Sequence, residues 1–289
     1  MAAWFSDRVW VPGVLLTSLV IGPSSGYAEI IRFQDMFRGT TVSAELCASK
    51  DHTVFVSAYG RGICMRYYLS TSGGDGQRAA VYLEGDMRGI APGSKHYRDK
   101  SVAIDTDTRN LERRAEALSW ATGQPAIYLA RMGINGSSGH FADRRTHLEL
   151  RITNLAIDAI KKRHGISSFD FVGQSGGSTL LAGLLPLRND VHCAVLGSGL
   201  LVTRESETRR AWARNDPALR MFDPQIGVPS IVRNSSARII VVSDRQDTTV
   251  PIQHQEPFVR RLKSAGRQVE QFFVQAKDPA TTASLRSRS

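Results

Sequence analysis

The residues best suited to covalent chemistry lie in a Gly-Gln-Ser-Gly-Gly sequence centred on Ser175. A serine hydroxyl is a weak nucleophile, so it must be held on a sharp, exposed turn where a base can reach it. Residues 169–172 form an apolar run typical of a strand, and 179–185 form a small-residue apolar run typical of a helix. A GxSxG sequence between a strand and a helix predicts a nucleophile turn. The N–H of Gly176 would then point toward a developing oxyanion.

Two further segments could complete this chemistry, because each follows a predicted strand. The Gly85–Asp86 turn comes after strand 79–83, where a backbone N–H can serve as the second oxyanion donor. Asp244 and Asp247 come after strand 237–242 and compete to be the carboxylate that orients an imidazole. We favour Asp247, which begins a D-x-x-V-P turn, and expect Asp244 to cap that turn.

A glycine-rich loop over 131–140 also follows a predicted strand. It could form a wall of the substrate site, with Arg131 or His140 touching substrate, or it could be a flexible connector. The sequence has no GK[ST] or GxGxxG motif and no Cys/His pair with zinc spacing. We therefore expect no cofactor and no metal.

These segments can converge only if the strands before them run parallel. We expect strands over 53–58, 63–69, 79–83, 126–130, 169–172, 194–196, 237–242 and 269–274, and helices over 108–122, 143–164 and 251–265 as well as after the serine turn. Asp143 is the expected cap of the 143–164 helix, and Pro251 is expected in the first turn of the last one. Regular alternation from residue 79 onward indicates an α/β fold, a mostly parallel sheet with helices on both faces. Ligand chemistry in such folds lies at the carboxyl ends of the strands.

Four segments in this order resemble the α/β-hydrolase superfamily over about 79–276: Val81–Asp86, Ala130–Gly139, Val172–Gly177 and Asp247–Pro251. The likeness is greatest to exported bacterial serine hydrolases of the prolyl-oligopeptidase/dienelactone-hydrolase type. It implies the α/β-hydrolase fold and a serine hydrolase, an esterase or a peptidase, that acts on a small-molecule ester or peptide. It also implies the site residues: Ser175 as nucleophile, Asp247 as acid, and Gly176, Gly85 and Asp86 at the oxyanion.

One part of the family pattern is missing from this sequence. The family carries its catalytic histidine on a loop after the last strand, followed by a covering helix, but residues 277–289 contain no histidine. His140 and His254 are the remaining candidates for the base. Two interpretations stay open: a chain truncated or frame-shifted after Asp278, with impaired catalysis, or a non-catalytic pseudo-hydrolase that binds ligands in the cell envelope.

The two ends of the chain differ in composition from the middle. Residues 9–22 are largely apolar and the small residues that follow suit cleavage before Glu29, which predicts a signal peptide over 1–28. We expect a hydrolase domain over 29–276 and a disordered or aberrant tail over 277–289. The protein would be periplasmic or secreted.

The charge pattern limits the classes of binding partner, and the cysteines allow a disulfide. The net charge of +10 comes from scattered basic residues such as Arg144 and Arg145, which we interpret as solvated helix charges. No interleaving of aromatic and basic residues suggests nucleic-acid binding, and weak association with an anionic envelope surface is the remaining expectation. Cys47 and Cys64 flank a predicted hairpin and could form a disulfide or stay reduced; the oligomeric state is left open.

Overall fold

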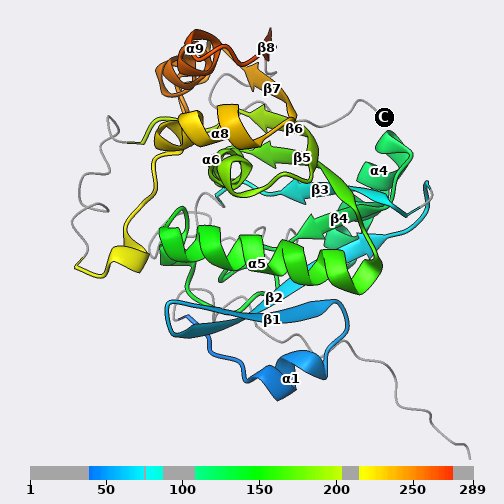
Figure 1. Ribbon diagram of the computed structural model, residues 1–289. Coiled ribbons are helices and arrows are strands. Elements are labelled where there is room, and N and C mark those ends of the chain that lie inside the picture. The colour runs from blue at the N-terminus through cyan, green and yellow to red at the C-terminus, as the bar shows by residue number, and fades with distance from the viewer. Residues whose placement is uncertain (1–38, 75, 87–107, 204–214, 276–289) are drawn as a thin grey trace, which may run out of the picture.

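Figure 1 shows the computed structural model of the chain, which describes residues 39–74, 76–86, 108–203 and 215–275. An eight-stranded sheet crosses the described part in the order β1-β2-β4-β3-β5-β6-β7-β8. The pairings β1–β2 and β2–β4 are antiparallel, and all pairings from β4 to β8 are parallel. The strands are β1 (Thr53–Ala58), β2 (Arg61–Ser70), β3 (Arg78–Leu83), β4 (Ala126–Leu129), β5 (Ser168–Gln174), β6 (Val191–Gly197), β7 (Arg238–Ser243) and β8 (Val269–Phe273).

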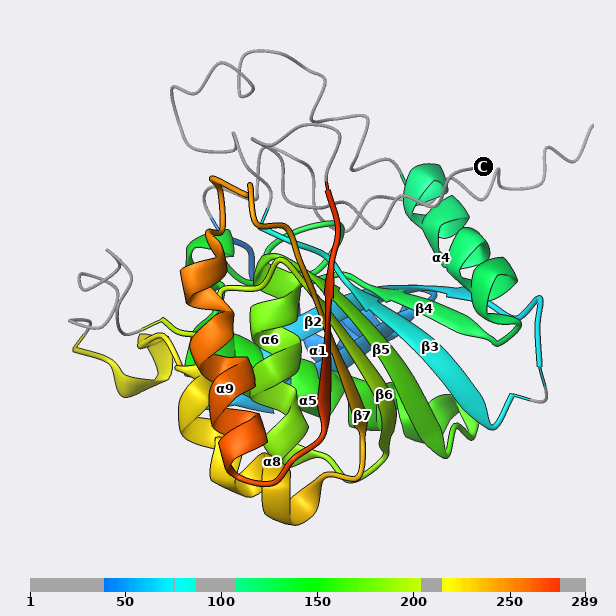
Figure 2. The same ribbon diagram turned by 90° about the horizontal axis from the view of Figure 1, so that it is seen from above.

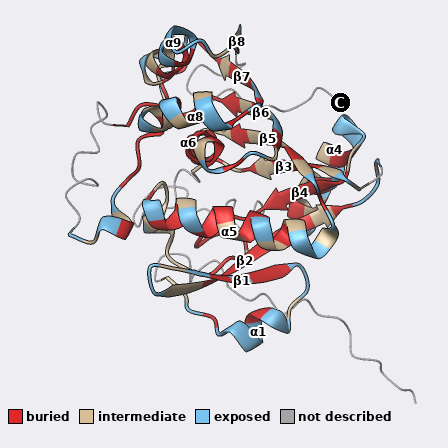
Figure 3. Cartoon of the chain, viewed as in Figure 1, coloured by how far each residue is buried: buried red, intermediate tan, exposed pale blue. Residues whose placement is uncertain are grey.

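Helices cover both faces of this sheet, as the alternating pattern predicts (Figure 2). One face packs against α5 (His147–His164), α6 (Gly176–Leu184), α8 (Val228–Asn234) and α9 (Glu256–Ser264), and the other packs against α4 (Thr108–Thr122). The larger core lies under α5 and α6 (Figure 3), with Phe169, Phe171 and Leu180 fully buried. A smaller core joins Leu111 and Ala115 of α4 to tyrosines of β2 and β4.

Helix α5 begins later than the sequence suggests. Its N-cap is Thr146, whose hydroxyl accepts the N–H of Glu149, while Asp143 belongs to the preceding 3₁₀ turn η2 (Phe141–Asp143). The assignment of Asp143 as the cap was therefore wrong. A threonine followed three residues later by glutamate is itself a capping pattern, so two start signals competed within four residues. The predicted end is confirmed, because Gly165 takes the left-handed conformation with φ of 65°.

The region after β6 differs most from the sequence-based prediction. The 251–265 helix splits into the 3₁₀ turn η6 (Ile252–His254) and α9, and the proline in the first turn of α9 is Pro257 rather than Pro251. A proline lacks the N–H that would continue the preceding turn, so a helix can start there but not run through it. The polar stretch before β7 also contains short elements that the sequence pattern missed: η4 (Pro217–Leu219), η5 (Pro224–Gly227) and α8. A further turn, η3 (Leu185–Leu187), follows α6.

The hairpin of β1 and β2 is tied to the short helix α1 (Ala44–Ala48) by a disulfide between Cys47 and Cys64. The structure thus selects the paired alternative for these two cysteines, whereas Cys193 on β6 is a free, half-buried thiol. Both bonded sulfurs are fully buried together with Val42.

The expected signal peptide over 1–28 and the expected tail over 277–289 both lie outside the described residues. Within the described ranges, no helix combines the length and apolar character needed to cross a membrane.

Candidate active site

Ser175 occupies the sharp turn between β5 and α6 and has a strained backbone, with φ of 50° and ψ of −118°. A non-glycine residue with positive φ and this ψ is rare and costs free energy, so it persists only where the surrounding structure enforces it. The Ser175 side chain makes no capping hydrogen bond to α6, although serine is a preferred cap. Its hydroxyl is therefore not used to stabilise the helix, and the first N–H groups of α6 have no intrahelical acceptor.

The end of β3 passes directly against this turn. A Cβ on Gly85 would lie 3.0 Å from the Cβ of Ser175 and 3.2 Å from the carbonyl oxygen of Gln174. A Cβ on Gly177 would lie 2.0 Å from the carbonyl oxygen of Leu83. Gly177 therefore requires glycine because its backbone meets the backbone of β3, and a side chain at Gly85 would crowd Ser175. The turn after β3 therefore packs closely on the serine turn.

Buried hydroxyls fix the first turn of α6 to the sheet. Ser178 is fully buried, and its single hydroxyl proton is shared between the carbonyls of Gly173 (2.6 Å) and Gly197 (2.8 Å), near the ends of β5 and β6. Thr179 donates to the carbonyl of Leu200 (3.0 Å). These bonds hold the helix start in one position relative to two strand ends, which is the rigidity that a reactive serine needs.

Asp247 lies beyond the end of β7, on the same sheet edge as Ser175, with β6 between their two strands. It is 3% exposed. Its Oδ1 accepts the N–H groups of Thr249 (2.8 Å) and Val250 (3.0 Å), but its Oδ2 is buried with no hydrogen-bond partner among the described residues. A buried carboxylate oxygen without a donor is costly, and it marks the position that an N–H donor could fill.

Asp244 accepts the N–H of Gln246 at 2.8 Å through its Oδ1, two residues along the chain. This is the turn-capping contact expected of it. Both acids therefore accept backbone N–H groups of their own turn, and Asp247 differs in having a buried Oδ2 without a hydrogen-bond partner among the described residues.

No family model matches the sequence, and none of the curated proteins matches it either. Solved structures do share its fold. The esterase Pf2001 of Pyrococcus furiosus superimposes with a TM-score of 0.54 at 13% identity, over 82% of this chain and 85% of that one. Est1E of Butyrivibrio proteoclasticus, solved with ferulic acid, gives 0.52 at 14% identity over 77% and 89%. An acylaminoacyl peptidase of Pyrococcus horikoshii gives 0.52 at 13% identity, over 78% of this chain and 37% of that one.

The chain has the α/β-hydrolase fold. The mostly parallel sheet with helices on both faces and the sharp strand-to-helix turn at Ser175 are features that the sequence resemblance implied. The site lies at the carboxyl edge of the sheet, where ligands bind in open α/β folds. A cavity of about 790 Å³ opens at the opposite edge, at the amino ends of β6, β7 and β8, and is not part of this site.

The structure shows a side-chain contact for His140 and backbone contacts for His254, the two histidines considered as bases. The Nδ1 of His140 accepts the N–H of Ala142, and its ring lies against Gly39. His254 ends η6, and its carbonyl accepts the N–H groups of Leu201 and Val202. Among the described residues, no imidazole hydrogen-bonds Asp247.

The 131–140 loop is neither an open substrate wall nor a loose connector. Most of it is buried, and its Ser137 and Ser138 hydroxyls accept the N–H groups of Arg66 and Cys64 on β2. These bonds fix the loop against β2. Arg131 is 1% exposed and pairs with carboxylates, which argues against the alternative in which Arg131 touches substrate.

Arg131 belongs to a buried ion cluster beside Ser175 that the sequence analysis did not identify. Its guanidinium bonds both oxygens of Glu149 (2.8 and 2.9 Å) and the Oδ1 of Asp86 (2.8 Å). Burial alone lowers the pKa of Arg131, but the Glu149 and Asp86 carboxylates outweigh it and hold that pKa above its ordinary value. Arg144 and Arg145 also face Asp86, at 3.4 and 3.2 Å, so their interpretation as solvated helix charges was wrong.

These arginines keep Asp86 ionised. Burial alone raises the pKa of Asp86, but Arg145, Arg131 and Arg144 lower it to about 2. A carboxyl group whose pKa falls on folding stabilises the native state above its unfolded pKa of about 4. That contribution is therefore complete above pH 4 or so and is lost as the pH falls toward 2.

A signal for this cluster was present in the sequence. Glu149 falls between Leu148 and Ile152 on the apolar face of α5, where an acid needs a cation. The Arg144–Arg145 pair just before the helix cap supplies nearby cations. Only the fold, however, brings Asp86 into the same place from a different strand end.

Proposed function

We propose that this protein is a serine hydrolase that cleaves a carboxylic ester or peptide through an acyl-enzyme on Ser175. The observation that carries the proposal is the strained backbone of Ser175, with its side chain left out of the helix cap and Gly85 packed against it. A strained backbone costs free energy, and here it places a half-buried serine on a sharp turn at the sheet edge, the position of a nucleophile.

Each neighbouring group takes a defined role. The Ser175 hydroxyl attacks the carbonyl carbon, and the leaving group departs as the acyl-enzyme forms; water then releases the acid. The N–H of Gly176 and an N–H of the Gly85–Asp86 turn stabilise the oxyanion. The proton of the Ser175 hydroxyl must pass to a base that then protonates the leaving group, and an imidazole in that role could donate its N–H to the open Oδ2 of Asp247, which would stabilise the imidazolium.

The substrate class follows from the site and from the structural neighbours. The neighbours are named as esterases and a peptidase, and one of them was solved with ferulic acid. Acyl transfer to a serine needs no metal or organic cofactor. We therefore propose a small ester or peptide as substrate.

The test is active-site labelling with a tagged fluorophosphonate, with and without added imidazole, followed by peptide mapping. We expect the label on Ser175, because only this hydroxyl lies on the strained turn. Ser175→Ala should remove the label, whereas Ser264→Ala, at the exposed end of α9, should retain it. A label that maps elsewhere, or that survives Ser175→Ala, refutes the proposal; absence of any label favours the non-catalytic alternative.

We also propose that the protein is exported, with residues 1–28 as its signal. The Cys47–Cys64 disulfide supports this, because disulfides persist in oxidising compartments. In an exporting bacterial host, the mature protein should appear in the periplasm or medium with Glu29 as its first residue, which N-terminal sequencing can check. Recovery of the Met1-initiated chain in the cytoplasm alone would contradict export.

A further inference from the structure

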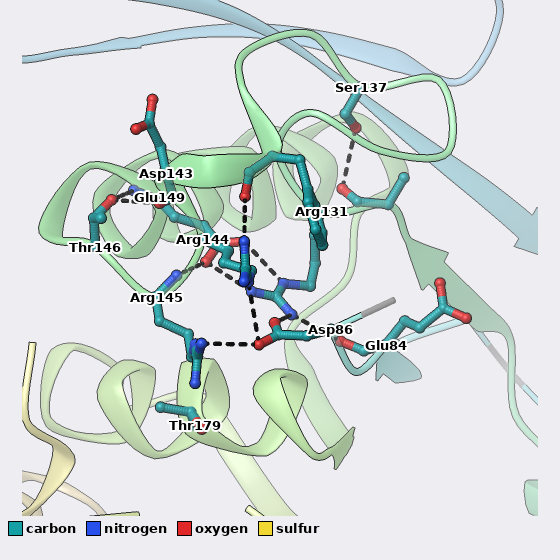
Figure 4. A network of polar contacts seen from close by, with 12 residues as sticks. Glu84, Asp86, Arg131, Ser137, Asp143, Arg144, Arg145, Thr146, Glu149 and Thr179 are labelled. Atoms are coloured by element: carbon teal, nitrogen blue, oxygen red, sulfur yellow. Dashed lines mark hydrogen bonds and ion pairs between the residues drawn. The ribbon is translucent and has the colours of Figure 1, made fainter. Parts of the chain in front are cut away.

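Asp86 lies between three guanidinium groups directly beside the proposed oxyanion donors (Figure 4). Its Oδ1 is 2.8 Å from Arg131, and its Oδ2 is 3.2 Å from Arg145 and 3.4 Å from Arg144. Arg131 comes from the end of β4, and the two other arginines come from the turn before α5. The segment after β4 and the turn before α5 therefore both meet the carboxylate that follows β3.

This carboxylate touches the backbone that would hold the oxyanion. A Cβ on Gly176 would lie 2.2 Å from the Oδ1 of Asp86 and 2.8 Å from the Nη1 of Arg131. The backbone of the Asp86 turn itself packs on Ser175 through Gly85. A negative charge at this position opposes the negative charge that develops on the substrate oxygen.

The cluster carries more positive than negative charge. Glu149 offsets part of the positive charge, because it accepts two bonds from the Arg131 guanidinium and the backbone N–H of Arg145. That leaves three guanidiniums facing two carboxylates. Arg131 further donates to the carbonyl of Glu84 at 3.2 Å, so it holds the backbone of the turn as well as its side chain.

We propose that Arg145, together with Arg131 and Arg144, is a positioning residue: it holds the Asp86 carboxylate away from the oxyanion and neutralises its charge. The Gly85–Asp86 turn can then present its N–H groups to a carbonyl oxygen while Asp86 fixes the shape of the turn. This inference rests on the proposed function, because it needs an oxyanion next to Gly176. It assigns the arginines an electrostatic role that does not require contact with substrate.

A double-substitution experiment separates this role from simple structural support. The rate of fluorophosphonate labelling at Ser175 is measured in the presence of imidazole for wild type, Arg145→Gln, Asp86→Asn and the double variant, with Arg151→Gln on the exposed side of α5 as the control. Arg145→Gln should slow labelling about tenfold, less than the loss of a whole oxyanion donor. The double variant should recover most of that loss, because the carboxylate that needed neutralising is gone. The Arg151→Gln control should label at the wild-type rate.

The alternatives give different patterns. If the arginines only brace the fold, the double variant removes more contacts and labels more slowly than Arg145→Gln, which overturns the inference. If Arg145→Gln lowers the melting temperature enough to unfold the protein at the assay temperature, Arg144→Gln, whose side chain is 34% exposed, takes its place with the same expectation. A wild type that does not label at Ser175 overturns the proposed function and this inference together, whereas wild-type labelling without recovery overturns this inference alone.

Discussion

Added imidazole should accelerate the acylation of Ser175 by about 10²- to 10⁴-fold, the range that a positioned general base contributes. The physical reason is the open Oδ2 of Asp247, which is buried and lacks a donor among the described residues. A free imidazole that donates to this oxygen would present its other nitrogen to the serine hydroxyl. The measurement is the rate of p-nitrophenyl ester hydrolysis, or of fluorophosphonate labelling, against imidazole concentration.

Without imidazole, we expect ester hydrolysis only marginally above background, because the family position for the histidine, after β8, holds none in this sequence. N-methylimidazole is the matched control, since it has no N–H to donate to Asp247 and should accelerate the reaction far less. High activity that needs no imidazole would contradict this prediction. His140→Ala and then His254→Ala would show which side chain supplies the base.

Much of the fold follows from local patterns in the sequence. Strand and helix periods alternate clearly from residue 79, and helix α4 runs over 108–122 as its residues predict. The errors lie where several signals compete within one turn, as with Asp143 and Thr146 before α5. The short helix α8 was missed because its seven residues are too few for a period to emerge.

Part of the site could likewise be predicted from local motifs, and part depends on the fold. The location of Ser175 and Asp247 at one sheet edge could be predicted because each belongs to a short motif at a strand end, and parallel topology brings such ends together. The Asp86–Arg131–Arg145 cluster could not, since its members come from three segments and their pairing depends on β3 lying beside β4. A local pattern carries no information on such contacts.

The prediction that most directly tests the acid concerns Asp247→Asn, which should reduce imidazole-assisted acylation of Ser175 by about 10²- to 10⁴-fold. An asparagine can keep the two backbone bonds now made by Oδ1, so the turn would remain. It would, however, present an amide N–H where Oδ2 stands, and a donor cannot accept the imidazole N–H. It also lacks the charge that stabilises imidazolium.

Asp244→Asn is the matched control, because this acid lies three residues away and its Oδ1 already caps its own turn. It should leave the acylation rate within a few-fold of wild type, and equal losses from both substitutions would contradict the assignment of Asp247.

The acylation rate and the melting temperature of Asp247→Asn should move in opposite directions. A buried, unpartnered carboxylate oxygen destabilises the fold by about 1–3 kcal/mol, so its neutral replacement should raise the melting temperature while acylation falls. A carboxylate kept for structure alone would instead lose stability when replaced.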